Sequence, residues 1–151
     1  MAGLWFEEFS VGRRFEHEIR RTVTEADNTL FSAMTYNPAA IHIDHDYASR
    51  TEFGRPLVNS LFTLGLVVGL SVGDTTLGTT VGNLGFESTT FPKPVFHGDT
   101  IRAETEVKAV RPSKSRPGQG IVTFEHVGLN QRDEVVCRTV RNALMLGRPA
   151  V

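Results

Sequence analysis

The sequence feature that most constrains the fold is the segment 57–72, which is apolar on almost every side of a helix. Its apolar residues are Leu57, Val58, Leu61, Phe62, Leu64, Leu66, Val67, Val68 and Leu70. A helix that is apolar all round has no face for water and must be buried by other elements. Gly65 and Gly69 lower its helix propensity by about 1 kcal/mol each relative to alanine, but they let a sheet approach closely. We therefore expect a buried helix over residues 57–72 that ends at Gly73–Asp74.

Strand-like segments dominate the chain after this helix. They alternate apolar and polar residues or are rich in β-branched residues, and they span residues 79–86, 100–110, 120–129 and 135–146. Residues 130–133 are polar and predict a hairpin turn. One buried helix followed by antiparallel strands predicts an α+β fold, in which a sheet wraps around a central helix in a single domain of residues 1–151. Because such a sheet leaves edges exposed, pairing with a second copy is expected.

The segment before the central helix is expected to hold a strand and a short helix. Residues 14–23 alternate apolar and charged side chains, as a half-exposed strand does. Thr24, followed three residues later by Asp27, resembles a capping box and predicts a helix that runs to Met34. Pro38 then ends helical structure, because proline disfavours the helical conformation in the residue before it.

Composition excludes several classes of function. The 16 Lys and Arg residues balance 17 Asp and Glu residues, so the chain has no overall field for nucleic acid or an anionic membrane. A single cysteine, Cys137, excludes an intrachain disulfide and a cysteine-rich zinc site, and its apolar neighbours predict a buried thiol. The N-terminal residues lack the basic segment of a signal peptide, and no continuous apolar run reaches the roughly 20 residues that span a bilayer. We therefore expect a soluble, cytoplasmic protein.

The segment 35–46, TYNPAAIHIDHD, is the richest in groups that can perform chemistry. His42 stands between two isoleucines, which predicts a partly buried ring that faces a cleft and can transfer protons near neutral pH. A purely structural histidine is the alternative. His45 is flanked by Asp44 and Asp46, which favours a solvated surface, with one of these acids capping a brief helix that follows. A metal site at these four residues is disfavoured, because their spacing fits no closed ligand set.

Two further segments offer polar groups beside the predicted helix and sheet. Asn59 and Ser60 stand at the start of the buried helix, where backbone N–H groups lack partners and can hold an oxyanion; simple capping is the alternative. The segment FPKPVFHGDT, residues 91–100, predicts a fixed extended corner in which His97 and Asp99 are structural.

The segment RPSKSRPGQG, residues 111–120, is a basic loop that can bind phosphates through charge and hydroxyl groups. Its candidate residues are Arg111, Lys114, Ser115 and Arg116. A solvated loop without a ligand is the alternative.

Taken in order, these segments resemble the MaoC-like dehydratase family, the (R)-specific enoyl-CoA hydratases of hotdog fold. The resemblance covers residues 9–146 and rests on the TYNPAAIH segment, the turn FGRPLV at residues 53–58, and the corner FPKPVFHGD at residues 91–99. It implies a long helix wrapped by an antiparallel sheet, and a homodimer or higher homo-oligomer whose site forms where two such units meet. It further implies reversible hydration of an enoyl-CoA, with coenzyme A as part of the substrate and without a metal or redox cofactor.

The resemblance also implies site residues. The family's catalytic Asp–His pair falls on Asn37 and His42, and the asparagine is a departure because an amide cannot accept a proton as a carboxylate does. Asp27 and Asp44 are the candidates for a replacement carboxylate. The family's oxyanion donor falls on Asn59 and Ser60.

The loop at residues 111–116 would bind the phosphates of coenzyme A, and the combination of segments resembles the mesaconyl-CoA and itaconyl-CoA hydratases, which act on short C5 dicarboxylic esters. Arg55, or a residue that the sequence does not identify, is the candidate for binding the second carboxylate. Three alternatives remain: a hotdog thioesterase, a non-catalytic acyl-CoA-binding protein, and a subunit that pairs with a different hotdog chain.

Overall fold

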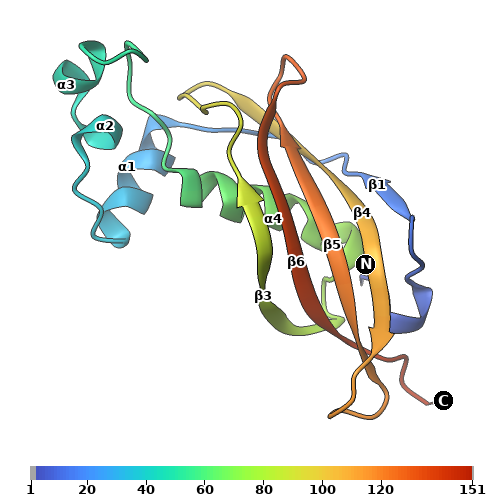
Figure 1. The fold of residues 1–151 in the computed structure, drawn as a ribbon. Helices are drawn as coiled ribbons and strands as arrows, with labels where there is room; N and C mark the ends of the chain where they lie inside the picture. Colours follow the sequence, from blue (N-terminus) through green and yellow to red (C-terminus); the bar gives the residue numbers. More distant parts are fainter. Residues whose placement is uncertain (1–2, 151) are drawn as a thin grey trace.

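The computed structural model describes residues 3–150 and consists of one antiparallel sheet, a central helix and a helical segment at one end of the sheet (Figure 1). The helices are η1 (Phe6–Glu8), α1 (Glu25–Met34), α2 (Ala40–Ile43), α3 (His45–Ser49) and α4 (Ser60–Thr75). The strands are β1 (Arg14–Glu16), β2 (Arg21–Thr22), β3 (Thr80–Thr90), β4 (Thr100–Pro112), β5 (Gln119–Leu129) and β6 (Val135–Leu146). The sheet order is β1-β4-β5-β6-β3, and β2 also pairs with β4.

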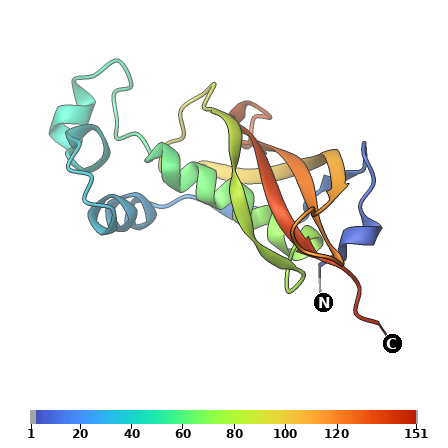
Figure 2. The ribbon, with the colours of Figure 1, turned by 60° about the horizontal axis from the view of Figure 1, so that its bottom comes forward.

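Helix α4 lies against one face of this sheet, which curves around it (Figures 1 and 2). The contact is close where the helix crosses β5, since a Cβ atom added at Gly128 would lie 2.3 Å from a methyl carbon of Val67. Val67 and Leu70 of the helix share a buried cluster with Ile101 of β4 and Cys137 of β6. The expected sheet around a central helix is therefore confirmed, and so is the buried thiol, whose pKa burial raises to about 11.

The central helix is displaced by three residues from the predicted segment. Residues 57–58 are extended instead, because Leu57 bridges to Phe96 and the Val58 N–H donates to the Val95 carbonyl at 2.9 Å. Asn59 then caps the helix by accepting from the Leu61 N–H. The predicted end at Gly73–Asp74 is wrong, since the helix continues to Thr75 before its C-cap at Thr76.

Among the strands, β6 has the predicted bounds, and β4 and β5 differ from them by one or two residues. Strand β3 runs four residues beyond the predicted Phe86, with bulges in its pairing to β6. The single strand expected over residues 14–23 is instead two short strands, because His17 between them turns into the core and is only 5% exposed. The Asn130 N–H donates to the Glu134 carbonyl and closes the predicted hairpin.

The helical segment before α4 follows the sequence signals closely. The Thr24 side chain accepts from the Asp27 N–H, the Asp27 carboxylate accepts from the Thr24 N–H, and α1 ends at Met34 as expected. Asp44 caps α3 by accepting from the Tyr47 N–H. Together α1, α2 and α3 extend beyond one end of the sheet, next to the start of α4 (Figure 2). No helix within residues 3–150 is both long and apolar enough to cross a bilayer.

Candidate active site

A single buried amide, that of Asn28 on α1, joins the segments that form the site. Its Nδ2 lies 2.8 Å from the Leu57 carbonyl oxygen, 3.1 Å from that of His42, and 3.0 Å from His97 Nε2. Its Oδ1 accepts the Asn59 N–H at 2.9 Å. Asn28 is fully buried, and its two N–H hydrogens are shared among the three acceptors around Nδ2, where an unpaired polar group is costly. Asn28 thus fixes α2, the FPKPVFHGDT corner and the start of α4 relative to α1.

His42 is half-buried on α2, as predicted, and its ring has a defined tautomer. Its Nδ1 lies 2.8 Å from the Leu57 carbonyl oxygen. Because a carbonyl oxygen can only accept, Nδ1 carries a proton, and the neutral ring therefore keeps a lone pair on Nε2. The same Leu57 oxygen accepts from Asn28, which ties the ring to the buried amide. This arrangement holds an oriented base in the way that a general base requires.

Asn37, the residue at the position of the family's aspartate, starts the turn that leads into α2. Its Oδ1 accepts the Ala39 N–H at 3.0 Å, an Asx turn. The preceding Tyr36 has a positive φ of 55°, which follows the end of α1. The Asn37 oxygen retains a second lone pair, and its amide nitrogen can donate. In this setting the side chain can orient a water molecule but cannot remove a proton from it.

Neither candidate carboxylate is free to replace the aspartate. Asp27 binds Arg21 through both oxygens, at 2.7 and 3.0 Å, and that arginine together with the Thr24 cap lowers the pKa of Asp27 to about 2. Asp44 caps α3. His42 is therefore the group in this segment with the geometry of a general base.

The N-terminus of α4 adjoins a cavity of about 250 Å³. Asn59 is buried and accepts from Leu61, whereas Ser60 is exposed and its N–H has no acceptor among residues 3–150. Ser60 and Thr63 supply hydroxyl groups to the wall of the cavity, and Leu57 also lines it. An N–H group at a helix N-terminus favours negative charge, so this turn can hold the oxygen of a polarised carbonyl.

The residue proposed from sequence for a second carboxylate, Arg55, lies outside that wall. Its guanidinium carbon is 3.8 Å from the centroid of the Phe96 ring, a cation–π contact. The cavity wall holds a different cation, Lys93, which the sequence reading did not single out. Its signal was its place in the FPKPVFHGDT corner, between two prolines.

One group of side chains near the site has the composition of a metal ligand set. Ligating atoms of Glu25, His45 and His97 lie within 4.8 Å of one another. These atoms already pair within the protein, since His45 Nε2 is 3.1 Å from Glu25 and His97 Nε2 is 3.0 Å from the amide of Asn28. Burial lowers the pKa of His97, which favours the neutral ring that accepts from Asn28. We therefore interpret the group as a hydrogen-bonded surface.

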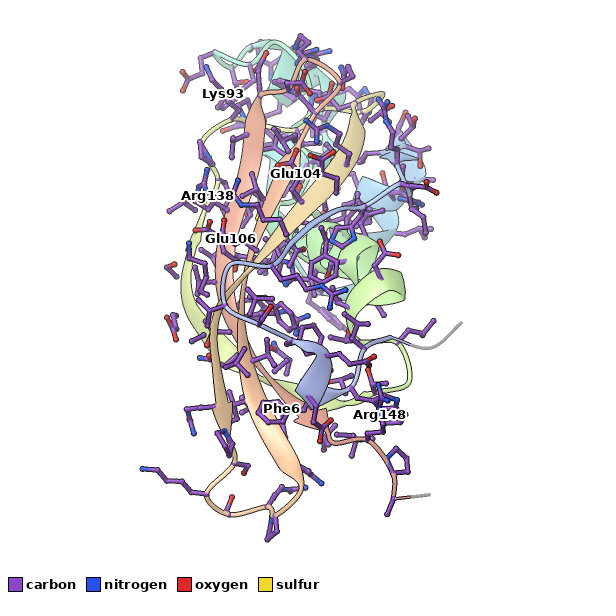
Figure 3. The ribbon with its side chains drawn as sticks, turned by 90° about the vertical axis from the view of Figure 1, so that its right-hand side faces the viewer. Phe6, Lys93, Glu104, Glu106, Arg138 and Arg148 are labelled. Carbon is purple, nitrogen blue, oxygen red and sulfur yellow. The ribbon has the colours of Figure 1, made fainter. Side chains whose placement is uncertain are left out.

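The basic loop lies far from His42 within one chain. Its residues, Arg111, Lys114, Ser115 and Arg116, are exposed and stand between the end of β4 and the start of β5. Gly120, next to the loop, packs against the Phe6 ring, and Figure 3 shows Phe6 and Lys93 at opposite ends of the sheet. The 11 residues of β5 separate these ends, which is about 35 Å at roughly 3.3 Å per residue. The loop cannot reach the His42 of its own chain.

The comparisons with known proteins agree with this fold. The model of the MaoC like domain matches residues 7–130. The chain belongs to the MaoC-like domain family. A mesaconyl-CoA hydratase of Cereibacter sphaeroides is 34% identical over 140 residues, which are 93% of this chain and 40% of that protein. The chain therefore spans about two fifths of the length of the first curated relatives that it matches.

Two solved structures confirm the architecture. A MaoC-like dehydratase from Rhodospirillum rubrum superposes with a TM-score of 0.84 at 32% identity, over 98% of this chain and 100% of that one. A Mycobacterium tuberculosis protein with a double hotdog fold superposes with a TM-score of 0.86 at 21% identity, over 99% of this chain and 46% of that one. The predicted hotdog fold is thus confirmed.

Proposed function

We propose that this MaoC-like domain catalyses the reversible hydration of an enoyl-CoA thioester to a 3-hydroxyacyl-CoA. The observation that carries the proposal is the bond from His42 Nδ1 to the Leu57 carbonyl, which leaves Nε2 as an oriented base on a ring tied to the segment that leads into α4. The related mesaconyl-CoA hydratase and MaoC-like dehydratase support this chemistry.

In the proposed reaction the thioester carbonyl lies at the start of α4, within reach of the Ser60 N–H. A donor placed there stabilises the negative charge that develops on the oxygen, an effect typically worth several kcal/mol. His42 Nε2 takes a proton from a water molecule that Asn37 orients, and the oxygen of the water adds to C3. The protonated ring then returns a proton to C2. General acid–base assistance of this kind contributes about 10²–10⁴-fold.

A second copy of the chain completes the proposed site. Strand β3 forms an edge of the sheet, and none of its 11 residues is buried. Val81, Leu84 and Phe86 on it are 44–55% exposed, an apolar surface of the kind that an interface covers. Because the basic loop is too far from His42 in its own chain, we propose that Lys114 and Arg116 hold the phosphates of a coenzyme A whose acyl group lies in the partner's site.

The acyl group in this proposal is a short branched dicarboxylic one, as in mesaconyl-CoA or itaconyl-CoA. The support is the likeness to a mesaconyl-CoA hydratase over most of this chain. Asn59 and Ser60, where the resemblance to the family places its oxyanion donor, give the site additional hydrogen-bonding groups.

A panel of enoyl-CoA thioesters tests the reaction. Loss of the absorbance of the conjugated thioester, with a product 18 mass units heavier, is the expected result, and His42→Ala abolishes it. Release of free thiol instead would identify a thioesterase. Tight binding without turnover of any member, which the Asn37 amide makes the main alternative, would identify an acyl-CoA-binding protein.

A further inference from the structure

The cavity beside the N-terminus of α4 has an uneven distribution of polarity. Most of its wall is apolar, formed by Phe53, Leu57, Val58, Phe91, Pro94, Val95 and Val136. Ser60 and Thr63 contribute hydroxyl groups, and Lys93 contributes the one ionisable side chain among the residues that line it. A carboxylate entering such a cavity would lose hydration, a cost that a cation in the wall offsets.

Lys93 has no carboxylate within 4.0 Å among the residues that the structure describes. The charge of Lys93 does act on one acid, Glu134. The pKa of Glu134 is lowered mainly by its hydrogen bond to Arg132 and to a smaller extent by the charge of Lys93. Glu134 already pairs with Arg132 at 2.9 Å. The ammonium group of Lys93 is therefore available to a ligand.

The backbone at Lys93 is held in place by its neighbours. Pro92 precedes it and Pro94 follows it, and a residue before proline is restricted to extended conformations. The Val58 N–H donates to the Val95 carbonyl at 2.9 Å, which ties this corner to the segment that leads into α4. The stem of Lys93 thus starts from a fixed point relative to Ser60, although the side chain itself is exposed.

We infer that Lys93 binds the terminal carboxylate of the acyl group and makes the site selective for dicarboxylic acyl-CoA substrates. The inference rests on the proposed function, which places the thioester carbonyl at Ser60. In a C4 or C5 diacid the second carboxylate lies only about 5 Å from that carbonyl, at about 1.5 Å per bond, so its partner must share the cavity with Ser60. Lys93 meets this condition.

The other cations proposed to bind the substrate do not share the cavity with Ser60. Arg55 lies over the ring of Phe96 and outside the cavity wall. Lys114 and Arg116 belong to the loop between β4 and β5, at the end of the sheet opposite the segment between β3 and β4 that carries Lys93 (Figure 1).

The experiment compares Lys93→Ala with the wild type on mesaconyl-CoA and on crotonyl-CoA, which has the same thioester and no second carboxylate. We expect kcat/KM to fall 10- to 100-fold on mesaconyl-CoA, as the loss of a hydrogen bond to a charged group predicts, and far less on crotonyl-CoA. Lys93→Arg should restore much of the loss. Lys108→Ala, an exposed lysine on β4 outside the cavity, is the matched control and should change neither value.

Equal losses on both substrates would overturn the inference, because they would mean that Lys93 binds the coenzyme A portion, as we expect of Lys114→Ala. No loss on either would overturn it as well. Should the wild type hydrate no thioester, the dissociation constants of succinyl-CoA and butyryl-CoA still decide the matter. A selective loss of succinyl-CoA affinity in Lys93→Ala would then support the carboxylate site while the hydratase proposal fails.

Discussion

Two buried polar networks lie at different places in this molecule, and they are built in different ways. At the site, the amide of Asn28 binds backbone groups of two segments, at His42 and at Leu57 and Asn59, and also the ring of His97. In the core, the network consists of side chains alone, and it runs from Arg141 of β6 through His126, Thr105 and His17 to the exposed carboxylate of Asp74 on α4.

Each hydrogen bond of the core network has a defined donor and acceptor. Arg141 donates to His126 Nε2 at 2.9 Å, His126 Nδ1 donates to Thr105 at 2.7 Å, and Thr105 donates to His17 Nε2 at 2.8 Å. His17 Nδ1 then donates to Asp74 at 2.7 Å. Each interior ring uses one nitrogen as donor and the other as acceptor, so no ring is left with a free lone pair.

The two networks differ in whether they leave a reactive atom free. At the site the hydrogen bonds are made largely by backbone groups. Nδ1 of His42 donates to a backbone carbonyl, and the lone pair of Nε2 stays available. In the core both nitrogens of each histidine are used, which gives cohesion between α4 and the sheet without a reactive atom. We therefore expect mutations at the site to affect turnover and mutations in the core to affect stability.

The sharpest test of this division is His42→Ala. Removing the base should lower the rate of hydration by about 10²–10⁴-fold, with little change in thermal unfolding because the ring is only half-buried. The rate is followed by thioester absorbance and the fold by circular dichroism. His45→Ala is the control, since its ring is exposed and pairs with Glu25. Unchanged turnover in His42→Ala would remove the catalytic role.

Asn28→Ala should lower both turnover and stability, because this residue belongs to the site and is also fully buried. It leaves the Asn59 N–H and the His42 carbonyl without their partner, at about 1–3 kcal/mol for each unsatisfied group. We expect a lower melting temperature together with a loss of turnover. Asn28→Asp keeps the acceptor for the Asn59 N–H but turns a second oxygen towards the Leu57 and His42 carbonyl oxygens, so its melting temperature should also fall below that of the wild type. Wild-type activity in either variant would contradict the positioning role.

The core network should make the stability of the fold decrease in acid. Burial, with the nearby charge of Arg141, lowers the pKa of His126 from 6.5 to about 3. Between these two pH values His126 is protonated in the unfolded chain but neutral in the folded one, so stability falls as the pH drops from about 6.5 towards 3. At pH 5 the loss is about 2 kcal/mol.

Urea unfolding at pH 7 and pH 5 measures this loss, and His126→Gln should reduce the difference between the two pH values. The Asp27 carboxylate, with a pKa of about 2, contributes only below about pH 4 and so does not confuse the comparison. An equal pH dependence in wild type and variant would show that His126 is not the group responsible.

The two networks also differ in how far the sequence could predict them. His42, Asn59 and Ser60 stand in recognisable local patterns, so the sequence singled them out as candidate site residues. The start of α4 was misplaced by three residues, because residues 57–58 pair with the corner at Val95 and Phe96. Asn28 was visible only as a polar residue inside a helix. Its partners lie 14, 29, 31 and 69 residues away, and no local pattern indicates them. Likewise, alternation predicted an exposed strand at His17, whereas the core network draws that ring inward.

The smallest expected effect belongs to Asn37→Asp, and it distinguishes the two possible roles of this position. A carboxylate oxygen can accept the Ala39 N–H as the amide oxygen does, so the turn into α2 should persist and stability should change by less than about 0.5 kcal/mol. The rate of hydration should change, because a carboxylate can share a proton with the attacking water and an amide cannot. Unfolding and kcat are measured on the same preparation. A variant that fails to fold would show that Asn37 is required for structure, whereas unchanged stability with altered kcat places it beside the water.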